Sequence, residues 1–361
     1  MRLLVFTAVA TVALAITCSG NTVPMIMNVS VETAGDTIRI TYDVDDPDGD
    51  RMTVLLRFAG ADGGVDGPVT GIGGDMGTGV LSGTAKVIAI DLAVATGLPE
   101  PLVPRILAHD GIGLGGEMIA VASTGGPDFL VDKYETTNEQ FAAFVLSDGY
   151  EFMDFWLVDD GTIEIVETGW NYAGKFQWLA PRFWDPSAEP PWSTDPNSGL
   201  ASTPVLGMSW FEAYAYCKWA GRRLPSSGEW LEAAGLDVRA YSWGNERTGG
   251  AEPPWFTLAN VRFGYEHYSF GGFTNDGSES AAPVGSHSPV GDSPLGIADA
   301  IGNAWEWCND VVAVVDYGTF SCATRPLRGG SWATAMPELV DPVKDLCPLY
   351  RTETIGFRCF R

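Results

Sequence analysis

Hydrophobic and polar residues alternate along several short segments in the first third of the chain. The segment 37–44 (TIRITYDV) alternates with a period of two, stops at the turn 46–50 (DPDGD) and resumes at 52–56 (MTVLL). Such alternation, bounded by Asp, Gly and Pro, predicts half-buried strands joined by tight turns. Further alternating segments lie at 86–93, at 105–108 and from Met118 onward. Together these segments predict an antiparallel, all-β sandwich over residues 22–125.

The pattern changes after the segment 123–127 (STGGP), whose glycines and proline predict a linker. Residues 137–149 have the spacing of an amphipathic helix. Two capping boxes, in which a Ser hydroxyl and a Glu carboxylate three residues later satisfy each other's free amides, predict helices after Ser209 and after Ser226. Beyond Gly235, frequent glycine and proline leave room only for short strands. This second part is therefore predicted to be α+β and rich in loops.

The first 20 residues predict a secretory signal. Arg2 precedes an apolar run at 3–16, which is too short to span a bilayer but suits the central region of such a signal. Cleavage after Ala15 would release a free protein, whereas Cys18, followed by Ser-Gly-Asn, suits the lipid anchor of a bacterial lipoprotein. No later segment is long and apolar enough to cross a membrane. Under either interpretation the sequence predicts a protein that works outside the cytoplasm.

Charge and composition narrow the classes of partner. The chain has 361 residues, with 21 Lys and Arg against 46 Asp and Glu, and a formal net charge of −25. This excess repels phosphate backbones and therefore argues against a nucleic-acid ligand. It favours cation binding instead, because carboxylates on loops are hard oxygen ligands for Ca²⁺. With 45% hydrophobic and 19% charged residues, the chain can bury a large core.

Two resemblances refine this organisation. The turn 46–50, with a later Asp110-Gly111, resembles cadherin-like and immunoglobulin-like modules of bacterial surface proteins, where its carboxylates either hold calcium or simply form turns. Over residues 128–361, a series of ordered motifs resembles the formylglycine-generating enzyme, or sulfatase-modifying factor, family, whose fold is a variant of the C-type lectin fold. The motifs are FLVDKYETTN at 129–138, PV at 204–205, SW at 209–210, AYCKWAGRRLP at 215–225, EW at 229–230, WGN at 243–245, PVG at 283–285, GNAWEW at 302–307, RGGSW at 328–332 and IGFR at 355–358.

The resemblance implies two calcium sites that cross-link loops. The first corresponds to the side chains of Asn260 and Asp276 with the carbonyl groups of Val261 and Ser278. The second corresponds to the side chains of Asp299 and Glu306 with the carbonyl groups of Gly302 and Ala304. Oxygen ligands of this kind suit a hard cation. The alternative interpretation is that the two aspartates cap turns and that Glu306 forms a salt bridge with an arginine.

The resemblance also implies a disulfide between Cys217 and Cys359, which export would permit. Its closed loop would be worth several kcal/mol in the chain-entropy model. If Cys18 is removed or acylated, five cysteines remain, so at least one is a free thiol or pairs with another molecule. Cys308 and Cys322 are close in sequence and are candidates for a second bond, which would leave Cys347 free.

The family's copper segment is incomplete. The resemblance implies a Cys-x4-Cys pair just after the Gly-Gly-Ser motif, where two thiolates hold Cu(I) for the oxidation of a sulfatase cysteine. Residues 333–351 contain one cysteine, Cys347, near the position of the second member of that pair and offset by one residue relative to Arg351. One thiolate does not reproduce the two-thiolate site, unless Cys322 approaches Cys347 and supplies the second.

Two functions of different class therefore remain. The interpretation we favour is a calcium-stabilised, non-catalytic binding or scaffold protein that presents residues 333–354 to a protein or peptide ligand. The alternative is a copper-dependent oxidase with Cys347 as its catalytic cysteine. Relatives that form sulfur–carbon bonds use iron held by three histidines. The three histidines here, His109, His267 and His287, lack the spacing of a ligand set.

Overall fold

In the computed structural model, the chain divides into two compact units. The first comprises Met1–Gly115, Ala143–Gln177 and Trp219–Gly221, and the second comprises Gly116–Ala142, Trp178–Lys218 and Arg222–Arg361. No helix among the described residues is long and apolar enough to cross a membrane. The structure describes residues 17–18, 21–22, 24–47, 49, 52–59, 71–95, 103–109, 117–146, 149–150, 153–156, 158, 178–185, 187–188, 190–245, 258–261, 280–316, 321–334 and 343–361.

The first unit contains two larger antiparallel sheets. One has the strand order β3-β4-β8-β6 and the other the order β7-β5-β9. A short pair, β1 with β2, lies nearer the N-terminus, and a single helical turn, α2 (Met153–Trp156), also belongs to this unit. The strands are β1 (Thr17–Cys18), β2 (Asn21–Thr22), β3 (Met25–Ala34), β4 (Thr37–Asp45), β5 (Met52–Ala59), β6 (Ile72–Gly74), β7 (Gly77–Val80), β8 (Gly83–Asp91) and β9 (Val103–His109).

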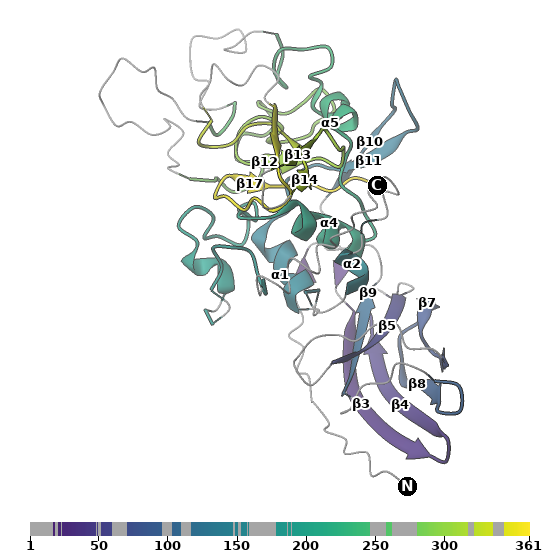
Figure 1. The fold of residues 1–361 in the computed structure, drawn as a ribbon. Coiled ribbons are helices and arrows are strands. Elements are labelled where there is room, and N and C mark those ends of the chain that lie inside the picture. The colour runs from purple at the N-terminus through teal and green to yellow at the C-terminus, as the bar shows by residue number, and fades with distance from the viewer. Residues whose placement is uncertain are drawn as a thin grey trace. The chain divides into compact units, whose positions relative to one another are not determined.

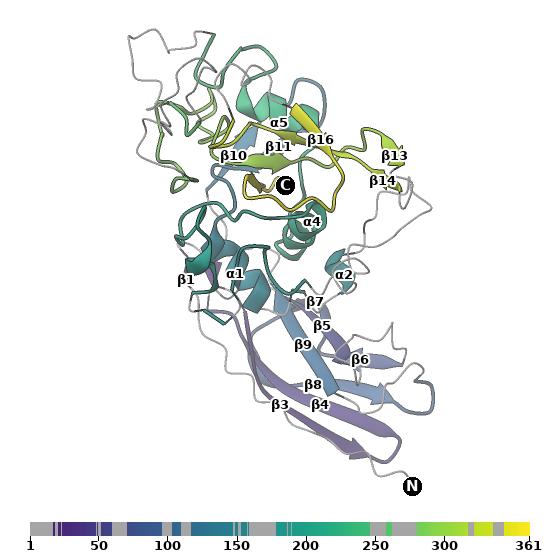
Figure 2. The ribbon, with the colours of Figure 1, turned by 60° about the vertical axis from the view of Figure 1, so that its left-hand side comes forward.

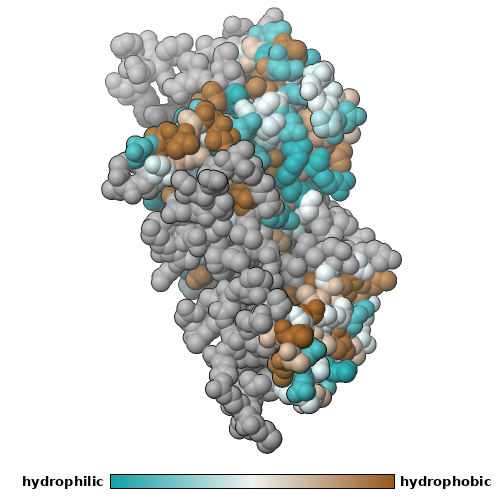
Figure 3. Space-filling model, turned by 45° about the vertical axis from the view of Figure 1, so that its right-hand side comes forward, coloured by the Kyte–Doolittle hydropathy of each residue, from teal (hydrophilic) through white to brown (hydrophobic). Residues whose placement is uncertain are grey.

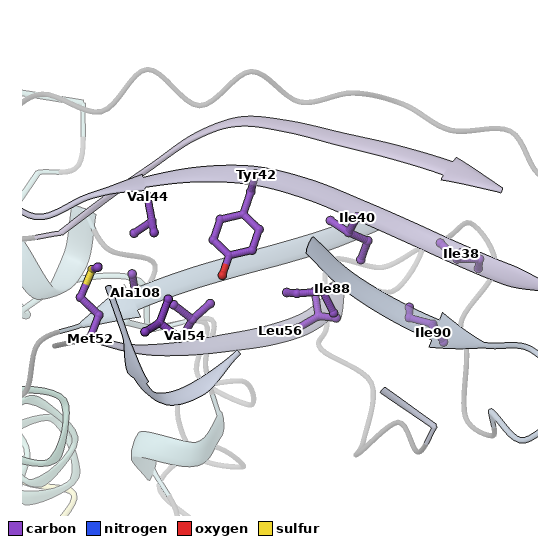
Figure 4. Packing of buried hydrophobic residues seen from close by; sticks show 11 residues of the cluster. Ile38, Ile40, Tyr42, Val44, Met52, Val54, Leu56, Ile88, Ile90 and Ala108 are labelled. Atoms are coloured by element: carbon purple, nitrogen blue, oxygen red, sulfur yellow. The ribbon is translucent and has the colours of Figure 1, made fainter. Parts of the chain in front are cut away.

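One hydrophobic core joins the two larger sheets. It takes buried residues from five strands, β4, β5, β7, β8 and β9. Among them, Ile40 of β4, Leu56 of β5, Ile88 of β8 and Ala108 of β9 have at most 2% of their surface exposed. Figure 4 shows these side chains pointing toward one another between the strands. Burying a large aliphatic side chain stabilises a fold by roughly 1.5–3 kcal/mol. The period-two pattern of the sequence therefore predicted the strands that build this core, while the likeness to cadherin or immunoglobulin modules stays a prediction.

The second unit combines short strands and helices with long loops (Figure 1). Mixed strands and helices in a loop-rich unit confirm the predicted α+β class. Its elements, two of which (α1 and α4) extend into the first unit, are β10 (Met118–Val121), β11 (Phe129–Asp132), α1 (Asn138–Leu146), η1 (Pro191–Thr194), α4 (Trp210–Trp219), α5 (Ser227–Ala234), β12 (Trp305–Trp307), β13 (Val314–Asp316), β14 (Ser321–Ala323), β15 (Arg325–Arg328), β16 (Val343–Leu346) and β17 (Ile355–Gly356).

The strand that begins at Met118 was expected in the first unit, but it belongs to the second. β10 pairs antiparallel with β11, with Met118 opposite Asp132. The segment 123–127, predicted as a linker, is therefore the connection of a hairpin inside the second unit. The division between the units falls after Gly115 instead. Turn residues alone do not distinguish a linker from a hairpin loop, because both need the same backbone freedom.

A four-stranded sheet with the order β16-β15-β12-β17 carries the later family-like motifs. Its edge strand β16 is labelled in Figure 2, and β12 and β17 are labelled in Figure 1. Glu306 of β12 lies opposite Arg328 of β15 and, on the other side, beside Gly356 of β17. The motifs GNAWEW, RGGSW and IGFR are thus adjacent strands or their flanking turns. β13 and β14 form a separate hairpin that precedes β15 directly.

The two predicted capping boxes begin α4 and α5. In α5, Ser226 accepts from the amide of Glu229, whose carboxylate accepts from the amide of Ser226, and Gly235 ends the helix in the left-handed region at φ 72°. At α4, Ser209 and Glu212 make the same reciprocal bonds, at 3.1 and 2.8 Å. The predicted helix at 137–149 is α1, which ends at Leu146.

The surface mixes residue types where it is described. Figure 3 shows hydrophobic and hydrophilic residues interspersed on one face.

Candidate functional site

The loop that follows the Gly-Gly-Ser motif begins at a turn with two glycines of positive φ. Gly329 and Gly330 have φ values of 93° and 78°, and a β-carbon at Gly329 would lie 3.0 Å from the carbonyl oxygen of Ala300. Only glycine fits such a position without strain. The backbone amide of Ser331 then donates a hydrogen bond to the Thr334 hydroxyl at 2.9 Å. The residues from 335 to 342 lie outside the described ranges, and the chain is described again from β16.

Cys347 follows β16 directly and lies in the interior of the second unit. Its surface is 1% exposed, and that of Cys322, in β14, is 8% exposed. The two thiols are in hydrogen-bonding contact. Burial raises the pKa of Cys322 to about 12, and the hydrogen bond to Cys347 and the charge of that thiol add to the effect. Cys322 therefore does approach Cys347, which the sequence alone left open.

Arg351 anchors the end of the same loop. Its guanidinium donates to the buried Glu212 carboxylate at 2.9 Å and to the carbonyl oxygen of Ala180 at 2.6 Å. Its Nε also donates to the carbonyl oxygen of Gly207 at 3.2 Å. Bonds from one guanidinium to three segments hold this part of the loop in a single position.

A cluster of buried charges lies beside the second predicted calcium site. Glu306 accepts two hydrogen bonds from Arg358, at 2.8 and 2.7 Å, and a third from the Trp230 indole at 2.7 Å. The salt bridge to an arginine that the sequence left open for Glu306 is therefore present. Burial alone would lower the pKa of Arg358, but the charge and hydrogen bonds of Glu306 outweigh it and hold that pKa above its ordinary value.

Two further carboxyl groups act on this pair electrostatically. Burial raises the pKa of Glu135 well above its usual value, and the charges of Asp299 and Glu306 raise it further. Burial also raises the pKa of Asp299, although the carboxylate accepts from the Gly285 amide at 2.5 Å. Three buried carboxyl groups thus face one guanidinium. Such an excess of negative charge in a poorly solvated region favours either a retained proton or an added cation.

Asn303 connects the two predicted calcium-binding loops. Its side chain donates to Glu135 at 2.6 Å and accepts from the Asn260 amide group at 3.1 Å, while its backbone amide donates to the carbonyl oxygen of Asn260 at 2.8 Å. Its backbone is in the left-handed region at φ 58°. Gly302 precedes it at φ 86°, in a position where a β-carbon would overlap the Asn260 carbonyl oxygen.

The structure describes some of the predicted calcium ligands and not others. Asn260 is buried with its Oδ1 atom unpaired, which is what a cation ligand requires, and Val261 beside it is also buried. Ala304 donates its amide to Glu135 at 2.9 Å. Asp276 and Ser278 lie outside the described residues. Within the ranges that the structure describes, no three His, Cys, Asp or Glu side chains form a ready metal cluster.

The cysteines of the predicted disulfide lie together. The sulfur atoms of Cys217, in α4, and Cys359 are 2.9 Å apart as buried thiols, and the bond between them stays a prediction. Cys308, the candidate partner of Cys322, lies instead in the core beside Trp230, with its sulfur 3.9 Å from the Glu306 carbonyl oxygen. The structure brings Cys322 to Cys347 because β14 leads directly into β15, whose first residue, Arg325, lies opposite Leu346 at the end of β16.

Sequence reasoning did not select Glu135, Asn303 or Arg358, although each lies within a quoted motif. Each is a charged or amide residue inside a quoted motif, which was the available signal. A buried charge requires a partner, but the sequence does not say which one. Of the histidines, His267 lies outside the described residues, the side chain of His109 is not described, and His287 is buried near Asp299.

Comparison with known proteins matches this architecture. Residues 113–361 match the model of the sulfatase-modifying factor enzyme 1-like domain. The formylglycine-generating enzyme of Thermomonospora curvata is 37% identical over 229 residues, which cover 57% of this chain and 68% of that enzyme. The inactive C-alpha-formylglycine-generating enzyme 2 of Bos taurus is 30% identical over 254 residues, covering 64% and 76%. The hercynine oxygenase of Mycolicibacterium smegmatis is 29% identical over 236 residues, covering 60% and 48%.

Proposed function

The chain belongs to the sulfatase-modifying factor enzyme 1-like family, and we propose that it is a calcium-stabilised, non-catalytic binding or scaffold protein. Family membership leaves the activity open, because relatives of similar identity are named as an oxidising enzyme, as an inactive form and as an oxygenase. The site therefore has to decide between them.

The burial of Cys347 carries the proposal. A copper oxidase of this family needs two thiolates that hold the metal and an open side from which a substrate cysteine reaches it. Cys347 is 1% exposed, and its only described thiol neighbour, Cys322, is 8% exposed. Two buried sulfurs leave little room for a third, so the arrangement favours loss of the oxidase activity.

The surface near this pair suits a protein or peptide ligand. Val343, in β16, is 47% exposed and Tyr350 is 46% exposed, while Cys347 between them is buried. Tyrosine is enriched in protein interfaces, and exposed apolar surface is typical of interaction sites. Under this proposal, the exported protein presents residues 333–354 to a partner. The protein itself is either free or anchored to the membrane through Cys18.

Calcium stabilises the loops in this proposal. The unpaired Oδ1 of the buried Asn260 and the excess of carboxyl groups around Arg358 both fit a cation. Asn260 would hold the first ion. Asp299 would hold the second, with Glu306 only if its carboxylate exchanges its bonds to Arg358 and Trp230 for the ion. When bound, calcium would supply positive charge and cross-links between loops.

The experiment offers the reduced protein Cu(I), oxygen and a peptide that carries a sulfatase cysteine, with the Thermomonospora curvata enzyme as the positive control. We expect no conversion of the thiol to an aldehyde by mass spectrometry, while the control converts it. Turnover by the wild-type chain that Cys347→Ser abolishes would overturn the proposal.

The copper-dependent oxidase is the second candidate, and the contact between Cys322 and Cys347 is the observation in its favour. Two soft thiolates suit Cu(I). This candidate requires the loop to open so that substrate reaches the metal, and it predicts that Cys322→Ser and Cys347→Ser each abolish turnover.

A further inference from the structure

A second dithiol lies in the interior of the second unit, apart from Cys217 and Cys359. Cys322 belongs to the β13–β14 hairpin, where it lies opposite Val315. Cys347 follows β16, whose last residue, Leu346, lies opposite Arg325 of β15. Only two residues separate Cys322 from Arg325. The two cysteines therefore flank the same end of β15, and their thiols are in contact.

We propose that Cys322 and Cys347 form a disulfide that links the β13–β14 hairpin to the loop between β16 and β17, residues 347–354. Backbone hydrogen bonds hold the chain on both sides of the thiol pair, next to Cys322 and next to Cys347. The hairpin is held by Thr324, which donates from its amide to the carbonyl oxygen of Ala313 at 2.7 Å, and the loop is held by Tyr350, whose amide donates to the carbonyl oxygen of Cys347 at 3.0 Å. Two thiols that are already in contact and held in place lose little further conformational freedom when they are linked.

The bond forms by exchange with an external disulfide, either of an oxidoreductase or of glutathione. The Cys322 thiolate, the more exposed of the two, attacks one sulfur of the external disulfide and releases one thiol. The Cys347 thiolate then attacks the sulfur of Cys322 and releases the second thiol. The pair loses two electrons and its two protons, and the external disulfide is reduced to two thiols.

The acidity of Cys322 sets the rate of this exchange. Because burial raises its pKa to about 12, the thiolate is scarce in the folded protein at neutral pH. We expect the oxidation of reduced, folded protein to accelerate by about tenfold for each pH unit between pH 7 and pH 10, in step with the thiolate fraction. Oxidation during folding, before Cys322 is buried, avoids this limit.

The other cysteines do not compete for this bond. Cys217 and Cys359 lie within 2.9 Å of each other. Cys308 is fully buried, and its sulfur faces the Glu306 carbonyl oxygen. In the oxidised protein neither Cys322 nor Cys347 is a thiolate, so soft-metal binding at this pair requires prior reduction.

The test maps the cysteines of the full chain after equilibration with oxidised glutathione. Free thiols are alkylated in denaturant, and the protein is digested without reduction by trypsin and chymotrypsin. Cleavage after Phe320 separates Cys308 from Cys322. We expect one cross-linked mass containing Cys322 and Cys347, which reduction resolves. In Cys322→Ser, the peptide with Cys347 should become alkylated, while the link between Cys217 and Cys359, if present, is unchanged.

Two results would overturn the proposal. One is alkylation of both Cys322 and Cys347 in wild-type protein that retains its native circular dichroism after the oxidative treatment. The other is a cross-link between Cys308 and Cys322. Neither result bears on the copper-dependent turnover assay, which tests the proposed function separately. The wild-type map needs no variant, so a folding defect in a serine variant does not affect the outcome.

Discussion

Asn303 connects three loops of the second unit. Its side chain bonds to Glu135 and to Asn260, and its carbonyl oxygen accepts from the Trp332 amide at 3.0 Å. It thereby joins the chain after β11, the first predicted calcium loop and the Gly-Gly-Ser-Trp motif. Its left-handed backbone suits asparagine better than most other residues.

We predict that Asn303→Ala lowers the free energy of unfolding by on the order of 3 kcal/mol, because it leaves several buried polar groups without partners. Chemical denaturation measures this change. Asn28→Ala is the matched control, since Asn28 also has a positive φ of 53° but is exposed. The Asn28 side chain donates one exposed hydrogen bond, to Asp43 at 2.6 Å, so this variant reports the backbone cost together with the loss of that bond. Equal losses in the two variants would contradict the assigned role of the buried network.

Helix α5 shows how a local signal and a tertiary contact combine in one element. Its capping box is encoded within four residues, and its second carboxylate, Glu232, accepts from the hydroxyl of Ser123 at 2.8 Å and from the amide of Thr124 at 2.5 Å. The helix therefore begins through its own sequence and is fixed against the β10–β11 hairpin by a residue that the sequence pattern did not single out.

The capping box predicts a pH dependence of stability. Burial opposes the ionisation of Glu229, but hydrogen bonds from Arg223 and Ser226 outweigh it and hold the pKa of Glu229 below its usual value. As the pH falls, the unfolded chain therefore binds the proton first. The stabilisation is complete above the unfolded pKa of about 4.3 and is lost as the pH falls through the lower, folded pKa.

Glu229→Gln should therefore cost on the order of 1 kcal/mol at pH 7, and the difference from wild type should shrink below pH ~4. Urea midpoints measured between pH 3 and pH 7 give this comparison. A difference that stays constant over the whole range would show that the charge of Glu229 does not contribute.

At the scale of the whole molecule, the second unit has few long elements, and its loops are held by buried polar groups. Glu306 with Arg358 is one such interaction, and both side chains are about 1% exposed. Breaking a buried pair of this kind usually costs about 3–5 kcal/mol, since the remaining charge is left uncompensated. A bound cation would stabilise these loops further, because oxygen ligands from different loops would bind the same ion.

We predict that calcium raises the Tm of the protein. Saturation at about 100 times the Kd adds about 2.7 kcal/mol of stability. Asp299→Ala should remove much of this dependence, whereas Asp345→Asn, which changes an exposed aspartate of β16, should retain it. Thermal melts with calcium and with chelator measure the shift. A wild-type Tm that does not respond to calcium would remove both predicted sites.

Local patterns determined much of this protein. The period-two segments encoded β4, β5, β8 and β9, and the capping boxes encoded the starts of α4 and α5, because such signals act between residues that are near in sequence. The ordered motifs determined the family. The partners of buried charges and thiols were decided only by the tertiary structure. Arg358 meets Glu306 because β12 pairs with β17, and Cys322 meets Cys347 rather than Cys308 because β15 pairs with β16. Pairing between strands that are distant in sequence is not encoded in local patterns.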